Sequence, residues 1–264
     1  MSPRVVLITA GGTREPIDDV RHISNVASGQ LPAAMAECWL ELGATVHYVH
    51  GPGAHIPARL RVAFDVLVGQ ETGSDAAFEA GLAALLTQAR DRRRKCSAGR
   101  LICYPITTAA EAARVVRQVA AAQQPTVAAC AMAVADFAPQ PILGKLSSRP
   151  DGETPSALHV VLEPTQKVID GVLQASPDTA LLGFKLLSGA AESAHIAATR
   201  HLAERSGARW VFGNDMSDYR RGVRRGALRG RDGGVLALLG DERGLDVREL
   251  ATSLVGAIEA HLPS

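Results

Sequence analysis

The chain is poor in the residues that mark disulfide-rich or zinc-binding proteins. Only four of its 264 residues are cysteine. Cys38, Cys96, Cys103 and Cys130 form no C-x-x-C pair, and no histidine lies at zinc-ligand spacing from them. We therefore interpret the four thiols as small buried apolar groups in a reducing compartment.

The chain also lacks a strong charge and a long apolar run. Its formal net charge of +1 gives no reason to expect nucleic acid or an anionic membrane as a partner. The basic cluster Arg90–Lys95 has no interleaved aromatic residues, so we interpret it as a solvated loop. No apolar run approaches the ~18–20 residues that span a bilayer, and Met1 leads directly into an expected strand, which leaves no room for a signal peptide. We expect a cytoplasmic protein.

Apolar residues make up 47% of the chain, which is enough for a substantial core. Strand and helix patterns alternate along it, which is typical of a layered α/β fold, and no repeat or interdomain linker interrupts them. We expect one domain over residues 1–264. The expected strands are 5–8, 45–49, 101–106, 127–134, 158–162, 180–187, 210–212 and 235–239. The expected helices begin near residues 30, 76, 108, 166, 190 and 246.

Two stretches are expected to be irregular. The segment from Ala138 to Pro155 is rich in proline and glycine and is predicted to be a mobile loop. The basic, glycine-rich stretch Tyr219–Arg231 is predicted to be a mobile excursion. A capping box of Thr108 and Glu111 opens one helix, and Asp246 with Glu249 stands at the start of the last.

The first 30 residues carry the strongest functional signal. Gly11 and Gly12 follow a strand that is apolar on both faces, at the end where ligands bind in open α/β sheets. Glycine there allows the backbone to come close to a ligand, although such a pair also serves in an ordinary tight turn. The polar residues Ser24, Asn25, Ser28 and Gly29 stand just before a helix, where free N–H groups bind anions.

Four later segments also lie at expected strand ends or in the loops that follow. In Ala131–Phe137, small residues expose the backbone, and Asp136 can accept from a hydroxyl or amine, help hold a metal, or only cap a turn. In Gly144–Ser148, Lys145 suits a clamp on a phosphate or an acyl oxyanion, or is an ordinary exposed lysine. In Leu182–Leu187, Lys185 interrupts an apolar strand and must reach an anion or a structural carboxylate. Gly213–Asp215 places polar groups at a further strand end. One cleft could gather all four.

The stretch Leu7–Asp18 followed by Val20–Gln30 resembles the signature of the phosphopantothenate–cysteine ligases, which make 4′-phosphopantothenoylcysteine for coenzyme A. The four later segments occur in the same order as that family's strand ends and clamp loop, and Val161–Ile169 is similar to a further family stretch. Ala27, Met132 and Gly213 depart from its usual residues. The clamp and the residues around Lys185 are similar to the free-standing branch, and this chain contains no flavin-dependent decarboxylase half.

The resemblance implies a three-layer α/β/α, Rossmann-like (ribokinase-like) fold with a mostly parallel sheet and helices on both faces. It implies that phosphopantothenate attacks CTP or ATP to give an acyl nucleotide, which L-cysteine then converts to the amide, with Mg²⁺ as cofactor. It also implies a homodimer in which each site is completed by the partner chain.

The resemblance assigns roles to individual residues of this chain. The implied catalytic residues are Asn25, Lys145 and Lys185. The implied nucleotide-binding residues are Gly11, Gly12, Thr13, Ser28, Gly29, Asp136, Phe184 and Asn214, and the implied substrate-binding residues are Arg21, Asn25, Ala133, Val134, Ala135 and Lys145. No metal ligand is assigned.

Two alternatives remain open from the sequence. A strand followed by Gly11 and Gly12 also suits an NAD(P)-dependent reductase, but the third glycine of the dinucleotide fingerprint is missing and His50-Gly51 stand where an acid is expected. The second alternative is a nucleotide-binding relative that has lost activity through Met132 or Ser147.

Overall fold

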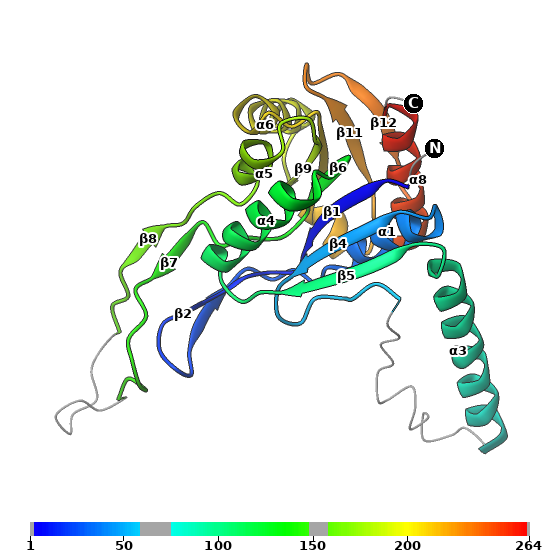
Figure 1. Cartoon of the computed structure of the whole chain (residues 1–264), viewed down its shortest axis with the longest axis horizontal. Helices are drawn as coiled ribbons and strands as arrows, with labels where there is room; N and C mark the ends of the chain where they lie inside the picture. The colour runs from blue at the N-terminus through cyan, green and yellow to red at the C-terminus, as the bar shows by residue number, and fades with distance from the viewer. Residues whose placement is uncertain (1–2, 59–74, 148–157, 263–264) are drawn as a thin grey trace.

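The computed structural model describes residues 3–58, 75–147 and 158–262, and the side chains of residues 75–78 lie outside this description. An eight-stranded sheet forms the centre, in the order β12-β11-β10-β9-β6-β1-β4-β5 (Figure 1). The strands are β1 Val5–Ala10, β4 Thr45–His50, β5 Arg100–Pro105, β6 Val127–Cys130, β9 Ala180–Leu187, β10 Trp210–Asp215, β11 Gly226–Gly230 and β12 Val235–Leu239. The strands from β5 to β10 run parallel, and β11 and β12 are added antiparallel.

Helices cover both faces of the sheet, which confirms the predicted three-layer α/β arrangement. On one face α1 (Gln30–Glu41) packs against α8 (Val247–Ala260), and α3 (Asp75–Cys96) lies beside α1. On the other face lie α4 (Ala109–Gln123), α5 (Asp170–Ala175) and α6 (Glu192–Ser206). The short α7 (Met216–Arg220) follows β10. No described helix has both the length and the apolar character that a membrane crossing requires.

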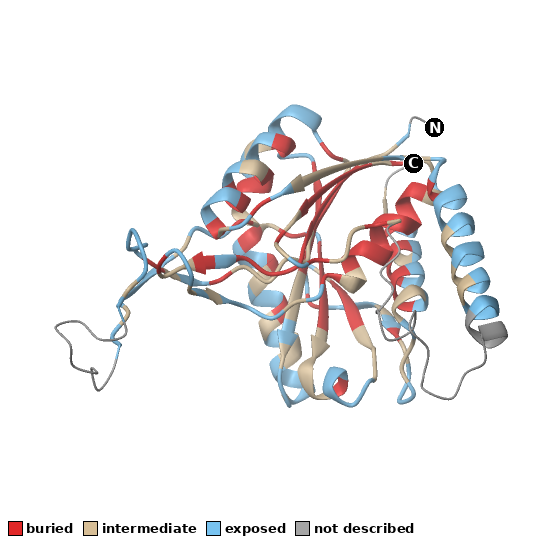
Figure 2. Ribbon diagram, turned by 90° about the horizontal axis from the view of Figure 1, so that it is seen from below, coloured by how far each residue is buried: buried red, intermediate tan, exposed pale blue. Residues whose placement is uncertain are grey.

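The core lies along the two faces of the sheet, where buried residues concentrate (Figure 2). One cluster joins β1 and β4 to α1 and α8 through Met35, Trp39 and Tyr48, none of which has exposed surface. The other joins the sheet to α4 and α5. The Trp39 indole N–H donates to Glu259 of α8 at 3.0 Å, so its polar group is satisfied in the core.

The predicted helix starts at Thr108 and Asp246 are confirmed, since each forms a capping box with the glutamate three residues later. Other boundaries were wrong. The strand expected over residues 127–134 ends at Cys130, the strand expected over 158–162 is β8 (Leu162–Pro164), and the helix expected from Gln166 begins at Asp170. Short apolar runs do not specify their ends, because neighbouring segments decide where backbone pairing stops.

Both predicted irregular basic stretches proved partly regular. Arg90–Lys95 continues α3 instead of forming a loop, and Arg92 is paired with the buried Glu37 at 3.2 Å. The excursion expected over Tyr219–Arg231 contains β11, which pairs with β10 on one side and β12 on the other. The sequence reasoning missed this strand because it contains arginine and glycine rather than a run of apolar residues. One of its inward side chains is the buried Arg229, whose charge is paired with Glu192.

A second region, which we call the arm, projects from the body of the molecule (Figure 1). It comprises the hairpin of β2 (Arg14–Pro16) and β3 (His22–Ser24), the pair of β7 (Phe137–Pro139) and β8, and residues 140–147. The loop predicted from Ala138 is therefore wrong at its start, and its residues 148–157 lie outside the described part of the chain.

Candidate active site

A cleft of about 520 Å³ opens at the carboxyl ends of β1, β6 and β9, where α5 and α6 approach the sheet. We call it the strand-end cleft. This is the edge at which ligands bind in open α/β sheets. Its lining residues are Thr9, Cys130, Met132, Ala133, Val134, Asp136, Lys167, Val168, Ile169, Phe184, Lys185, Leu186, Ala198, His201, Leu202 and Arg205.

The predicted glycine pair lies beneath this edge rather than on its surface. Gly11, Gly12 and Thr13 are all buried. A Cβ on Gly12 would lie 2.2 Å from the backbone oxygen of Asn25, so glycine is required there by contact with the chain itself. The sequence reasoning expected close approach to a ligand instead. Direct nucleotide contact by these three residues stays a prediction.

Thr13 and Asn25 hold the segment that follows β6. Gly12 forms an isolated bridge with Ala133, and the Thr13 hydroxyl accepts from the Ala135 N–H at 3.1 Å. The exposed Asn25 donates its side-chain N–H to the carbonyl of Val134 at 3.0 Å. The structure therefore brings Asn25 to Val134, one of the residues predicted with it as substrate contacts, and hence to the segment that also holds Ala133 and Ala135.

Asp136 ends this segment and forms an ion pair with Lys167. Both side chains are exposed, 67% and 47% respectively, so they are accessible to a ligand. Thr165 fixes the same turn, since its N–H donates to the Asp136 carbonyl at 3.0 Å and its hydroxyl donates to the Ala135 carbonyl. Asp136 is thus placed at the cleft as predicted, but with a cationic partner that the sequence reasoning had not assigned to it.

Lys185 lies near the end of β9, half-buried, and lines the strand-end cleft beside Phe184. It makes no hydrogen bond or ion pair with any residue in the described part of the chain. The predicted alternative of pairing with a structural carboxylate is therefore not seen there. Phe184 packs edge-on against Phe212 with ring centroids 5.8 Å apart, which fixes the strand that carries the lysine.

Sequence reasoning missed several cleft residues. His201 and Arg205 are one helical turn apart on α6, and this spacing was the signal that places them on one face. Arg205 bonds both carboxylate oxygens of Asp170 at 2.7 Å. Burial raises the pKa of the Cys130 thiol to about 12, so this cleft residue is a protonated apolar group and not a nucleophile.

The cationic residues of the cleft outnumber its acids. Lys167, Lys185 and Arg205 line it, whereas Asp136 is its single acid. A cleft with this balance favours an anionic ligand. The described residues contain no group of three or more histidine, cysteine, aspartate or glutamate side chains that could hold a metal ion.

Ser28 and Gly29 lie at the start of α1, as predicted. Gly29 is the N-cap residue with φ of +70°, a left-handed conformation that favours glycine. Gly29 has no side chain to cap the helix, but the exposed Ser28 hydroxyl accepts from the Gln30 N–H at 3.4 Å. His55 donates its backbone N–H to the Ser28 carbonyl at 2.9 Å, which ties the turn to the loop after β4. Neither residue lines the strand-end cleft, and their contact with a nucleotide stays a prediction.

Arg21 and Lys145 lie on the arm, away from the lining of the strand-end cleft. Arg21 is paired with the buried Asp18 at 2.6 Å, and the Leu146 N–H donates to the same carboxylate at 3.1 Å. Although burial opposes ionisation, hydrogen bonds from the N–H groups of Val20, Leu146 and Arg21 hold the pKa of Asp18 below its usual range. Lys145 is exposed and has no described partner. The predicted catalytic lysines are therefore not in one cleft of one chain.

Asn214 is also separated from the other predicted residues. It lines a second cleft of about 490 Å³ at the end of β10, between α6, α7 and β11. The predicted gathering of all four late segments in one cleft is wrong for this segment and for the Lys145 segment. Ser148, the last residue of the Lys145 segment, lies outside the described residues.

Comparisons with known proteins agree with this architecture. Residues 1–74 match the family model described as the DNA/pantothenate metabolism flavoprotein C-terminal domain. The chain is 27% identical over 229 residues to the coenzyme A biosynthesis bifunctional protein CoaBC of Thermococcus kodakarensis. That match covers 86% of this chain and 45% of the relative, so the chain spans about half the length of the curated relative it matches.

Two solved structures share the fold. The DNA/pantothenate metabolism flavoprotein from Streptococcus pneumoniae has a TM-score of 0.68 at 20% identity, covering 98% of this chain and 99% of its own. A Cab2 mutant in complex with phosphopantothenate-cysteine has a TM-score of 0.70 at 21% identity, covering 97% of this chain and 86% of its own. These matches confirm the resemblance found in the sequence and the fold predicted from it.

Proposed function

We propose that this chain is a nucleotide-dependent ligase that joins 4′-phosphopantothenate to L-cysteine through an acyl-nucleotide intermediate. The observation that carries this proposal is Lys185, a half-buried cation without a described partner, in a cleft that is also lined by Val134, the residue to which Asn25 donates. A desolvated lysine is stabilised by an anion, and both substrates of the first step are anionic.

In the first step a phosphopantothenate carboxylate oxygen attacks the α-phosphorus of the nucleotide, and the bond from that phosphorus to pyrophosphate breaks. Two anions must meet, so the protein has to neutralise charge and fix their positions. Lys185 would bind the phosphates, and Lys167 lines the same cleft. Asp136 holds Lys167 in place and is itself accessible to the nucleotide.

In the second step the cysteine amine attacks the acyl carbon and the nucleoside monophosphate leaves with the carboxyl oxygen. The exposed Asn25 amide retains acceptor and donor capacity beyond its bond to Val134, so it can bind the acyl nucleotide. The backbone groups of Ala133 and Ala135 are hydrogen-bonded to Gly11, Thr13 and Thr165, which fixes this segment. Turnover then depends on the geometry of this segment rather than on a protein nucleophile.

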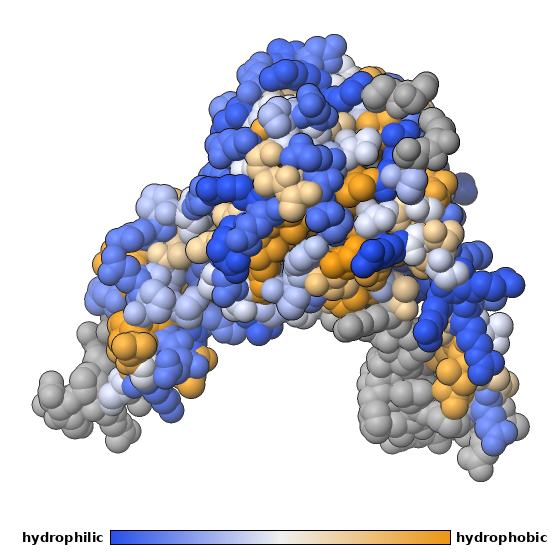
Figure 3. Space-filling view, viewed as in Figure 1, coloured by the Kyte–Doolittle hydropathy of each residue, from blue (hydrophilic) through white to orange (hydrophobic). Residues whose placement is uncertain are grey.

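Lys145 and Arg21 would contribute to the proposed site only if a second copy of the chain brings them to it. The arm exposes large apolar side chains, including Leu143 at 97% and Phe137 at 52%, and apolar surface gathers on it in Figure 3. Apolar residues exposed this strongly on a projecting region suit burial against another subunit. We propose a homodimer in which the arm of one chain supplies Lys145 to the strand-end cleft of the other.

In this proposal Mg²⁺ would arrive bound to the phosphates of the nucleotide. The cleft offers one carboxylate, Asp136, which is already paired with Lys167, so the described residues do not form a metal site of their own. Mg²⁺ commonly binds through one or two carboxylates and the substrate phosphates, and no step above depends on it. The choice between CTP and ATP is left to the assay.

The test is pyrophosphate release with phosphopantothenate, using CTP and ATP separately, with and without cysteine. The proposal requires release that depends on phosphopantothenate with at least one nucleotide, and amide formation only when cysteine is added. Nucleotide binding without pyrophosphate release would instead indicate an inactive relative. Reduction of a substrate by NADPH would indicate the reductase alternative.

A further inference from the structure

The cleft at the end of β10, which we call the β10 cleft, is not used by the mechanism proposed above. Its floor runs across three neighbouring strands, because Gly213 of β10 pairs with Ala227 of β11, which pairs with Leu238 of β12. Gly213 and Ala227 are buried, and Thr199 of α6 lies over Gly213, whereas Leu238 is 75% exposed. The accessible apolar part of this floor is therefore the side chain of Leu238.

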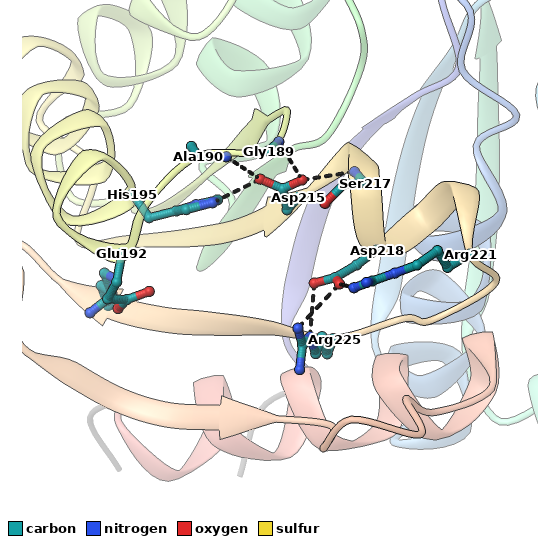
Figure 4. A network of polar contacts seen from close by, with 10 residues as sticks. Gly189, Ala190, Glu192, His195, Asp215, Ser217, Asp218, Arg221 and Arg225 are labelled. Atoms are coloured by element: carbon teal, nitrogen blue, oxygen red, sulfur yellow. Dashed lines mark hydrogen bonds and ion pairs between the residues drawn. The ribbon is translucent and has the colours of Figure 1, made fainter.

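The acids of this cleft have little acceptor capacity left (Figure 4). Asp215 accepts from the N–H groups of Gly189, Ala190 and Ser217, at 2.8, 3.1 and 2.7 Å, and lies 3.1 Å from a ring nitrogen of His195. These bonds, led by those from Ser217 and Gly189, hold its pKa far below the usual range.

The second acid, Asp218, is similarly occupied. Arg225 bonds both of its oxygens, at 2.8 and 3.1 Å, and Arg221 bonds one of them as well. The third acid, Glu192, accepts from Arg229 through one carboxylate oxygen, and its side chain is 71% exposed to solvent.

The arginines, in contrast, have hydrogen-bond donors to spare. Arg225 uses Nε and one terminal nitrogen on Asp218, which leaves its other terminal nitrogen without a described partner. Arg229 is 2% exposed, lines the cleft, and its Nε is buried with no hydrogen-bond partner among the described residues. A buried unpaired donor is costly unless a ligand or solvent satisfies it.

We propose that the β10 cleft is a second binding site, for a small molecule that carries a phosphate group on a flat apolar body. The surplus of guanidinium donors over free acceptors matches phosphate oxygens, which accept several charged hydrogen bonds at once. The exposed side chain of Leu238 offers an apolar contact for the body of such a ligand. The volume of about 490 Å³ suits a ligand of this size.

The site shares a wall with the strand-end cleft. Glu192 and His195, in the first turn of α6, line the β10 cleft, while His201 and Arg205 further along the same helix line the other. Occupation of one cleft can therefore influence the other through the position of one helix.

The test titrates the 264-residue chain with phenyl phosphate and, separately, with inorganic phosphate, and calorimetry measures the binding. Arg225→Gln removes the guanidinium, and we expect about tenfold weaker binding of both probes, as for a lost charged hydrogen bond. Leu238→Ser alters only the exposed floor, and we expect it to weaken phenyl phosphate and leave inorganic phosphate unchanged. Arg220→Gln and Leu42→Ser are the matched controls, because both residues are exposed and neither lines the cleft.

Thermal unfolding of each variant separates a failure to fold from a failure to bind, and Leu238→Ser tests the site even if Arg225→Gln is unstable. Saturable wild-type binding that survives Lys185→Met would support a site distinct from the strand-end cleft. Absence of wild-type binding, equal binding by Leu238→Ser, or loss of binding in Lys185→Met would overturn the proposal. Lys185→Met is expected to disable the proposed ligase reaction without affecting binding in the β10 cleft. A failure of the ligase proposal and a failure of the β10-cleft proposal can therefore be told apart.

Discussion

The body and the arm carry different parts of the expected site, and they are built differently. In the body, Lys185 is half-buried on a strand of the central sheet, and packing of Phe184 fixes that strand. On the arm, Lys145 is exposed and the turn around it is held by hydrogen bonds to Asp18. In the proposed ligase, the core of one chain would position the nucleotide end of the site, whereas the arm of a second chain would supply the other end.

The largest effect is expected from the body. Lys185→Met should lower turnover by about 10²–10³-fold, as for removal of a preorganised donor to developing charge. The melting temperature should be unchanged or higher, because the cost of partly burying the charge is removed with the charge. Pyrophosphate release, nucleotide titration and thermal unfolding measure the three quantities. Lys95→Met, on α3 at the opposite face of the sheet, is the control.

A lower melting temperature for Lys185→Met with normal nucleotide affinity would assign the lysine to a structural pair and remove it from the site.

Asn25 lies where the body meets the arm, so it should show an intermediate effect. Asn25→Ala should slow conversion of the acyl nucleotide about 10–100-fold, since a hydrogen bond to the intermediate is lost. The fold should survive because the side chain is exposed. Single-turnover analysis of the acyl nucleotide measures the effect. Near wild-type turnover would show that Asn25 only ties Val134 to the loop.

On the arm, Leu143→Asp should weaken association of two chains by about tenfold or more, because it replaces an apolar contact by a charge. Sedimentation at several concentrations measures this effect. Leu42→Asp, an exposed leucine at the end of α1, is the control. A wild-type protein that is monomeric at all concentrations would remove the arm as a dimer surface.

The smallest effect is expected when the pH is lowered and Asp18 is protonated. The depressed pKa of Asp18 means that its stabilisation of the arm is full above the usual aspartate pKa and is lost as pH falls through the lowered value. The protection of the Leu146 amide against hydrogen exchange, relative to the intrinsic rate at the same pH, should therefore fall in acid in the wild type. In Asp18→Asn this protection should be low already at neutral pH. Identical exchange in both proteins would show that Asp18 does not anchor this turn.

Much of the body could be predicted from the sequence because local and global preferences agree there. Apolar strands, the Thr108 capping box and Gly43, a glycine with positive φ just after α1, each specify one structure. β11 could not be predicted, since its buried Arg229 depends on a partner distant in sequence, Glu192. The placement of Lys145 and Asn214 outside the strand-end cleft also depends on segments distant in sequence. The positions of strand ends alone therefore could not predict it.

The most direct measurement mixes two inactive variants, Lys185→Met and Lys145→Ala, under conditions that allow subunits to exchange. If the arm of one chain serves the cleft of the other, each mixed dimer has one site with both lysines, and random mixing restores about a quarter of wild-type activity. Our account predicts this recovery. If activity stays at the level of the separate variants while mixed dimers form, both lysines act within one chain, which would contradict the shared site.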